Sequence, residues 1–303
     1  MSWLPYKGVA QLTYAELTVH YDSAWTFKNL QLIPVRFKGN GNNIGLATPA
    51  MPKGSISLEE ALAKGKIKVK EMAGERGADL NLLQVTNTSK QAVVAPAGDL
   101  LTGGKQDRMI SQTTVIPPGS SAFLDVFCIE KGRWDDKATA FLHAGAAGRS
   151  LRKTMDRTGR QHEIWKEIER QFASENKVSQ TWPYLKLRRD AGAIDTGYFR
   201  YFMGKMRESD SAYAGFLAIT GNEVLDCELF SSTDVMNVSY PSMLKSWIES
   251  ALRGAPPVLS EVQKRPFMDK LLSSEASQSK FIATHGRRQK YLERVIHLIA
   301  YGD

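Results

Sequence analysis

Short runs of β-branched and aromatic residues, separated by turn residues, fill the first 135 residues and constrain the fold more than any other feature. Trp25 to Phe37 and Asp79 to Thr86 are two such runs, and residues of this kind favour strands because they fit a pleated, half-buried surface. Lys66 to Met72 alternates apolar residues with lysines, which is the two-residue period of a strand with one exposed face. The pattern predicts an antiparallel β-sandwich or curled sheet.

Helical patterns gather in the second half of the chain. Arg160 to Asn176 carries an apolar stripe at helical spacing, and Val235 to Arg253 is amphipathic and ends at a glycine and a proline pair. Glu261 to Ser274 is a further helical stretch, whereas Ala212 to Leu229 reads as a hairpin with a glycine-containing turn. In the first half, only a short helix capped by Ser57 is expected. The fold class predicted is therefore α+β, with helices concentrated in the second half.

A single domain over residues 1–303 is expected, because a chain of 303 residues can bury one large core. Its parts are a β-rich half over 1–135, a helical and irregular insertion over 136–210, and an α/β return over 211–303. Within the insertion, His143 to Thr158 is rich in glycine, alanine and basic residues. That composition predicts a mobile or loosely ordered segment.

The formal net charge of +8 favours anionic partners such as nucleic acid, nucleotides or acidic lipid head groups, although many soluble proteins are equally basic. The two cysteines, Cys128 and Cys227, are too few for a disulfide framework and match no zinc spacing. Neither a signal peptide nor a run of 18 apolar residues is visible. We therefore expect a protein of a reducing bacterial cytoplasm with no membrane partner.

The stretch from Gly98 to Trp134 combines backbone-permissive, charged and aromatic residues more densely than any other. Gly103 and Gly104 allow positive φ and a close approach of backbone or ligand. Successive amide groups in such a turn can bind an anion, and Lys105 and Arg108 add positive charge beside them. The turn predicts an anion site.

A structural interpretation of the same residues stays open, in which the turn is a β-bulge and Arg108 pairs internally with Glu130. Cys128 and Glu130 share one face of a strand, and a carboxylate would raise the pKa of a neighbouring thiol, so a catalytic cysteine is disfavoured. Glu130 is better suited to hold Arg108 or Arg133, and Trp134 to stack on a base or to cap the core.

We predict that this strand-turn-strand unit binds a ligand. The predicted ligand-binding residues are Gly103, Gly104, Lys105, Gln106, Arg108, Glu130, Arg133 and Trp134. No metal site is predicted, because the five histidines are scattered and His162-Glu163 lacks the second histidine of a zinc protease. The chain also lacks a Walker loop and a nucleophile elbow, so the sequence indicates neither a cofactor nor a catalytic residue.

Several long motifs resemble the ARG-and-rhodanese-phosphatase-superfamily-associated protein domain, a bacterial family named for its company with ADP-ribosylglycohydrolases and rhodanese-phosphatases. The runs that carry the resemblance are LEEALAKGKIKVKEM, LNLLQVTNTSKQAVVAPAGDLLTGGKQDRMI, VFCIEKGRW, RQHEIWKEIE, SQTW, GFLAITGNEVLDCELFSS and RVIHLIAYGD. They cover roughly residues 10 to 302. The resemblance implies a link to ADP-ribose or nucleotide signalling through gene association, and it assigns no role to single residues.

Three functions follow as hypotheses. The first is a ligand-binding or accessory module of a nucleotide- or ADP-ribose-linked signalling or defence system, with a protein partner from the same system. The second is an enzyme that processes such a ligand, with Glu130 as general base. The third is a scaffold that binds protein or nucleic acid through the basic segment Arg149 to Arg189, with the steep salt dependence typical of phosphate contacts.

Overall fold

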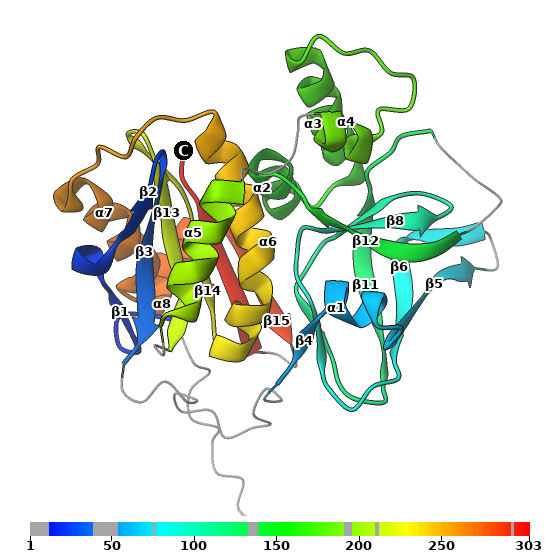
Figure 1. Ribbon diagram of the computed structural model, residues 1–303, viewed down its shortest axis with the longest axis horizontal. Coiled ribbons are helices and arrows are strands. Elements are labelled where there is room, and N and C mark those ends of the chain that lie inside the picture. Colours follow the sequence, from blue (N-terminus) through cyan, green and yellow to red (C-terminus); the bar gives the residue numbers. More distant parts are fainter. Residues whose placement is uncertain are drawn as a thin grey trace, which may run out of the picture.

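Two lobes lie side by side in the computed structural model (Figure 1). The structure describes residues 12–38, 54–74, 77–132, 139–190, 196–209, 212–291 and 294–303. One lobe, which we call the mixed lobe because it combines strands with helices, is an antiparallel sheet covered by helices on both faces, and the other, the β-rich lobe, is built mainly of strands. Nearly all the described strand pairs are antiparallel; β4 (Ile56–Ser57) beside β7 (Val93–Ala95) is parallel. The predicted α+β class with antiparallel sheets is confirmed.

The mixed lobe contains a sheet with the order β1-β3-β13-β14-β16-β15, and β2 pairs with β3. Its strands are β1 (Leu17–Val19), β2 (Trp25–Phe27), β3 (Leu30–Phe37), β13 (Tyr213–Thr220), β14 (Glu223–Phe230), β15 (Gly286–Tyr291) and β16 (Arg294–Tyr301), with a 3₁₀ turn at Tyr21–Ser23. Because β3 pairs with β13, the two ends of the chain share this sheet. The single domain expected over residues 1–303 remains a prediction.

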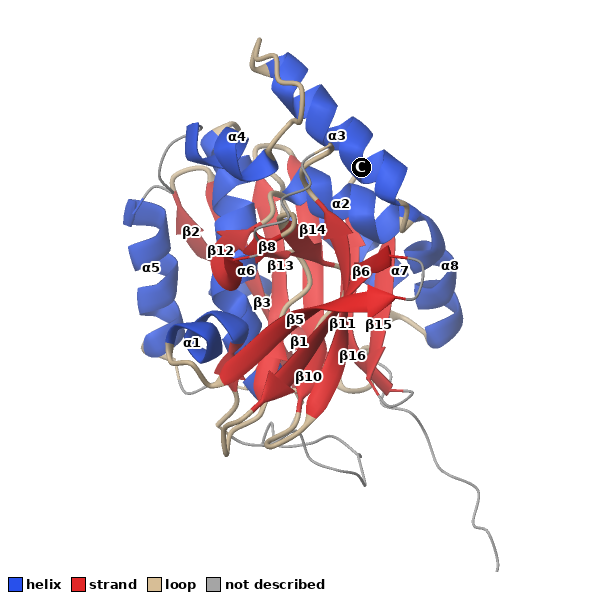
Figure 2. Cartoon of the chain, turned by 90° about the vertical axis from the view of Figure 1, so that its right-hand side faces the viewer, coloured by secondary structure: helices blue, strands red, loops and turns tan. Residues whose placement is uncertain are grey.

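Helices cover both faces of this sheet. Helices α5 (Thr196–Arg207) and α6 (Thr233–Leu252) lie on one face, and α7 (Glu261–Leu272) and α8 (Glu275–His285) on the other (Figure 2). Strand β13 explains the arrangement, because every one of its residues is buried. Its side chains alternate between the two faces: Phe216 and Ala218 join the core under α6, and Leu217 and Ile219 join the core under α7 and α8.

The β-rich lobe joins a three-stranded sheet, β10-β7-β4, to a six-stranded sheet, β12-β8-β9-β11-β6-β5. The further elements are α1 (Leu58–Ala63), β5 (Ile67–Gly74), β6 (Gly77–Asn87), β8 (Asp99–Gly104), β9 (Arg108–Ile110), β10 (Thr114–Ile116), β11 (Ser121–Cys128) and β12 (Thr139–Ala146). As predicted, Ser57 caps α1: its hydroxyl accepts a hydrogen bond from the Glu60 amide at 3.1 Å.

Three helices pack over one face of the six-stranded sheet and reach the junction of the lobes. They are α2 (Arg149–Thr158), α3 (Gln161–Ser174) and α4 (Tyr184–Asp190). Leu151 and Met155 of α2 are buried in a core that includes Leu100 and Met109 of the sheet. The prediction that His143 to Thr158 is loosely ordered is therefore wrong. The segment contains the end of β12 and the whole of α2, a helix with an apolar face, and only Ala147 and Gly148 lie between them.

Buried ionic groups join α2 to the sheet of the mixed lobe. The Arg152 guanidinium of α2 donates two hydrogen bonds to the Glu228 carboxylate of β14, at 2.7 and 2.8 Å. Burial raises the pKa of Glu228, but the charge of Arg152 and a hydrogen bond from His297 outweigh this and lower it. Both partners of this ion pair are at most 3% exposed, so removal of either leaves an uncompensated charge in the core.

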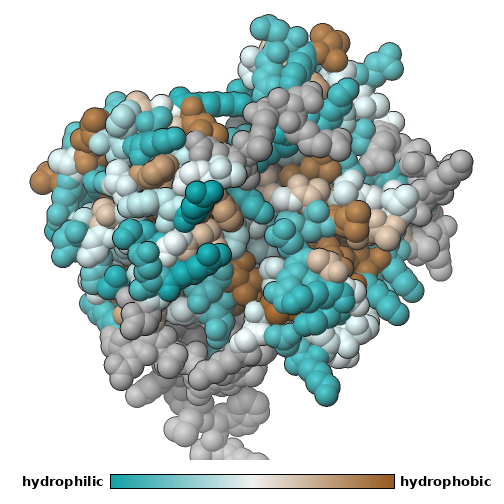
Figure 3. Space-filling model, in the orientation of Figure 1, coloured by the Kyte–Doolittle hydropathy of each residue, from teal (hydrophilic) through white to brown (hydrophobic). Residues whose placement is uncertain are grey.

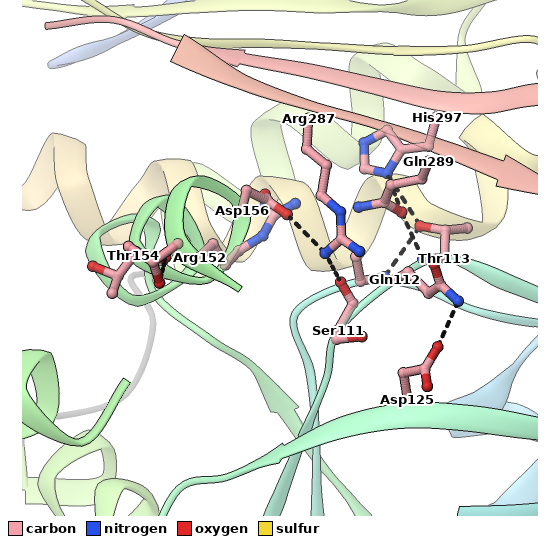
Figure 4. Close-up of polar contacts among 12 residues, drawn as sticks. Ser111, Gln112, Thr113, Asp125, Arg152, Thr154, Asp156, Arg287, Gln289 and His297 are labelled. Atoms are coloured by element: carbon pink, nitrogen blue, oxygen red, sulfur yellow. Dashed lines mark hydrogen bonds and ion pairs between the residues drawn. The ribbon is translucent and has the colours of Figure 1, made fainter. Parts of the chain in front are cut away.

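Polar contacts also join the two lobes directly. His297 of β16 lies 2.9 Å from Glu228 through Nε2 and 3.1 Å from the Thr113 hydroxyl of the β-rich lobe through Nδ1. In Figure 4, Arg287 lies between Asp156 of α2 and Ser111 of the β-rich lobe, and it donates to the Ser111 carbonyl at 3.0 Å. The segment between β9 and β10 leaves the sheet to make these contacts, so β9 and β10 are two short strands in different sheets.

Stability should fall as the pH rises above about 4, because Asp226 of β14 is buried beside Glu228. Burial and then the negative charge of Glu228 raise the pKa of Asp226 to about 7, whereas an unfolded aspartate titrates near pH 4. Between these values the folded state holds a proton that the unfolded state has lost, so the unfolding free energy declines with pH. Asp156, whose pKa burial also raises, adds to this decline.

Asp226→Asn should flatten that decline, and urea unfolding at pH 4.5 and 7.5 measures it. The asparagine oxygen can still accept the hydrogen bond that Trp247 Nε1 donates to Asp226. The exposed Asp22 gives the matched control, Asp22→Asn, which should leave the pH dependence as in wild type. An Asp226→Asn protein with the full wild-type decline would show that this carboxyl does not titrate in the folded state as described.

Candidate functional site

The predicted glycine turn begins at the end of β8, whose last two residues are Gly103 and Gly104, and the neighbouring strand β12 determines its shape. Gly103 and Gly104 have φ of +112° and +58°. A Cβ atom on Gly103 would overlap the carbonyl oxygen of Ala140 in β12, and one on Gly104 would overlap the ring of Phe141. Glycine is therefore required here by the close approach of β12 as well as by φ.

The turn does bind a carboxylate, and that carboxylate belongs to the chain itself. Glu71 Oε1 of β5 accepts a hydrogen bond from the Lys105 amide at 2.9 Å and lies 3.4 Å from Arg108 Nη2. Arg108 is only 1% exposed and also donates to Gln106 Oε1 at 3.2 Å. A free anion would have to displace Glu71 to use these donors.

The remaining predicted residues lie near the end of β11. Glu130 is buried, and its carboxylate accepts a hydrogen bond from the Thr181 hydroxyl at 3.4 Å. Arg133 and Trp134 lie outside the described residues. The structure thus brings together Gly103 to Arg108, while ligand binding by the predicted set stays a prediction.

Cys128, at the end of β11, is held through its backbone. Its amide donates to Gln161 Oε1 and its carbonyl accepts from Gln161 Nε2, both at 2.8 Å. Burial raises the pKa of the Cys128 thiol, which disfavours the reactive thiolate. These contacts give the residue a role in docking α3 onto the sheet.

A cleft lined by three arginines opens where α2, α3 and α6 meet, with a volume of about 140 Å³. We call it the arginine cleft. Its lining residues are Gly148, Arg149, Ser150, Arg170, Gln171, Ser174, Glu249, Ser250 and Arg253. Arg149 and Arg170 belong to the consecutive helices α2 and α3, whereas Arg253 is the C-cap residue of α6, far away in sequence. The sequence analysis did not bring Arg253 together with the other two.

Two of these arginines present their side chains to solvent. Arg170 is 61% exposed and pairs with Glu167 within α3, and Arg253 is 64% exposed and lies 3.4 Å from Glu175. Such exposed pairs are weak and can exchange partners. Arg149 is less exposed, and its guanidinium donates to the Leu225 carbonyl. The cleft therefore holds two cations that can reorient toward a ligand and one that is fixed.

The N-terminus of α2 adds to the positive potential of the arginine cleft. Gly148 occupies the N-cap position and makes no side-chain cap, so amides of the first turn lack that partner. The helix dipole favours an anion at this position. Glu249 also lines the cleft: its carboxylate lies against Gly148 at this helix end and pairs with Arg188, so a ligand anion would bind beside it.

The match to protein families covers most of the chain. The model of the ARG and Rhodanese-Phosphatase-superfamily-associated Protein domain matches residues 18–294. This chain belongs to that family. The resemblance predicted from the motifs is thereby confirmed, and no curated protein or solved structure matches it significantly.

Membership in the ARG and Rhodanese-Phosphatase-superfamily-associated family describes an association and not a reaction. The matched residues include both the glycine turn and the arginine cleft. In the described parts of the chain, no group of three or more histidine, cysteine, aspartate or glutamate residues is placed to hold a metal ion. No described helix is long and apolar enough to cross a membrane.

Proposed function

We propose that this protein is an accessory binding module of the bacterial cytoplasm that acts beside ADP-ribosylglycohydrolase and rhodanese-phosphatase proteins, and that it holds an anionic ligand of nucleotide or ADP-ribose type. The observation that carries the proposal is the arginine cleft. It combines Arg149, Arg170 and Arg253 with a helix N-terminus, and two of the three guanidinium groups are exposed.

The chemistry of the arginine cleft suits a phosphate group. Guanidinium groups present paired donors that match phosphate oxygens, and charge-assisted hydrogen bonds of this kind are about twice as strong as neutral ones. Ser150 contributes a hydroxyl at the first turn of α2, where it already contacts Arg170 at 3.1 Å. A cleft of about 140 Å³ is large enough for one phosphate or diphosphate, with the rest of the ligand outside it.

The basic-scaffold hypothesis receives less support from the same elements. It relied on Arg149, Arg152 and Lys153 as surface cations, but Arg152 is buried against Glu228. Lys153 donates to the Gly302 carbonyl at 2.6 Å. Two cations of the basic segment, Arg152 and Lys153, are thus engaged in contacts within the protein.

Isothermal titration with ADP-ribose and with inorganic pyrophosphate tests the proposal. We expect both to bind wild type, and Arg253→Ala to weaken binding at least about tenfold, since a hydrogen bond to a charged group contributes about 1.5–3 kcal/mol. Arg207→Ala is the matched control, because Arg207 is an exposed helical arginine that does not line the cleft. Absence of binding to wild type, or equal loss in both variants, would contradict the proposal.

A further inference from the structure

A second pocket, of about 180 Å³, lies where α6 of the mixed lobe faces β4 and α1 of the β-rich lobe. Its lining residues are Ser55, Ile56, Ser57, Glu59, Glu60, Asp99, Asn237, Val238, Pro241 and Ser242. We call it the acidic pocket, since it contains three carboxylates and, among the described lining residues, no lysine, arginine or histidine. The boundary between the lobes shows hydrophobic and hydrophilic residues side by side (Figure 3).

Asp99 is the residue that points to a ligand. It is the first residue of β8, is only 1% exposed, and lines the acidic pocket. Its Oδ2 atom lies 3.0 Å from His143 Nε2, whereas its Oδ1 atom has no hydrogen-bond partner in the described parts of the chain. A buried carboxylate oxygen without a donor is costly, so Oδ1 is the atom of this pocket that gains most from a hydrogen bond donated by a ligand.

The groups around Asp99 offer it few hydrogen-bond donors. The Gly145 amide donates to His143 Nδ1 at 3.4 Å, which leaves Nε2 as the donor to Asp99 and fixes the ring. Lys245 Nζ lies 3.8 Å from Glu59, and His143 Nδ1 lies 3.7 Å from the same carboxylate. Lys245 therefore faces Glu59, and no described cation is hydrogen-bonded to Asp99 Oδ1.

A proline in α6 adds one more acceptor to the same pocket. Pro241 has no amide proton, so the Asn237 carbonyl one turn earlier lacks its usual helical donor. Asn237 and Pro241 both line the pocket. The residues that line this pocket thus include three with carboxylates and one whose carbonyl lacks its helical donor, and the hydroxyl groups of the lining serine residues can accept as well.

We propose that the acidic pocket binds a small organic cation through a guanidinium or primary ammonium group that donates to Asp99 Oδ1. Such a group carries several donors and a positive charge, which matches a lining made of acceptors. A metal ion fits less well, because no three metal-ligating side chains among the described residues, the three carboxylates of this pocket included, are placed to hold one ion together. This site is separate from the arginine cleft and requires a ligand of opposite charge.

Methylguanidine and N-methylurea provide a matched pair of probes, since they share a shape and differ in charge. In titrations followed by amide chemical shifts, methylguanidine should bind the full-length protein and shift signals of the pocket residues, whereas N-methylurea should bind at least about tenfold more weakly. Asp99→Asn should reduce methylguanidine binding at least about tenfold for the same reason. The exposed Asp125 gives the control Asp125→Asn, which should bind like wild type.

Ser242→Leu provides a second variant that blocks the pocket without touching Asp99, and it should also abolish binding. It is the decisive test if Asp99→Asn does not fold. The proposal is overturned if methylguanidine does not bind wild type, if N-methylurea binds equally well, or if a folded pocket variant binds methylguanidine like wild type.

Discussion

Arg152→Met should lower the free energy of unfolding by about 3–5 kcal/mol, the usual cost of removing one partner of a buried ion pair. Glu228 is 0% exposed and would keep only His297 as a charged or polar side-chain partner among the contacts described for it. Methionine fills much of the volume of the arginine stem, so the loss reports the stranded carboxylate and not a cavity. Urea denaturation at pH 7 measures the effect.

Two variants give this prediction its control. Arg157→Met changes an exposed residue of the same helix and should alter stability by no more than about 0.5 kcal/mol. The double variant Arg152→Met with Glu228→Gln removes both charges and should recover part of the loss. An Arg152→Met protein as stable as Arg157→Met would show that the ion pair does not join α2 to the sheet as described.

Gly103→Ala should cost about 3–5 kcal/mol, the sum of backbone strain and overpacking. The residue has a φ of +112°, and the new methyl group would overlap the Ala140 carbonyl, a backbone atom of the neighbouring strand that cannot rotate away. Denaturation midpoints in urea should therefore fall sharply. The variant tests whether the glycine turn is shaped by β12.

Gly119→Ala is the matched control, because Gly119 has a φ of +63° and no atom within 4 Å of the added Cβ. This variant has the strain of a left-handed backbone without a steric overlap, and it should lower the free energy of unfolding by about 1–2 kcal/mol. Equal losses in the two variants would mean that β12 does not approach Gly103 closely, and the structural account of the turn would fail.

Elements governed by local sequence were predicted well. Ser57 caps α1, α6 begins within two residues of its predicted start, and β13 and β14 form the expected hairpin. Helix α8 was not predicted, because its apolar residues are few and its pattern is weakly amphipathic. The pairing of β3 with β13 joins residues about 180 positions apart, which no local pattern reveals.

In the candidate site, too, local features were predicted from the sequence and long-range contacts were not. The residue types and φ values of the glycine turn agree with the prediction, but the carboxylate in it comes from Glu71, more than thirty residues earlier. The arginine cleft was beyond sequence reasoning, since it exists only where three helices meet. Arg152 shows why a count of basic residues is a poor guide to a binding surface. It belongs to a basic segment of the sequence, but its side chain is paired with Glu228.

The most direct test of the proposed function is a crystal structure of the protein grown with ADP-ribose. We predict phosphate density in the arginine cleft, with the guanidinium groups of Arg170 and Arg253 turned from Glu167 and Glu175 toward the ligand. Density at the Gly103 to Arg108 turn, with Glu71 displaced, would instead support the site predicted from the sequence. A cleft that stays empty at saturating ADP-ribose would contradict our proposal that it is the anion site.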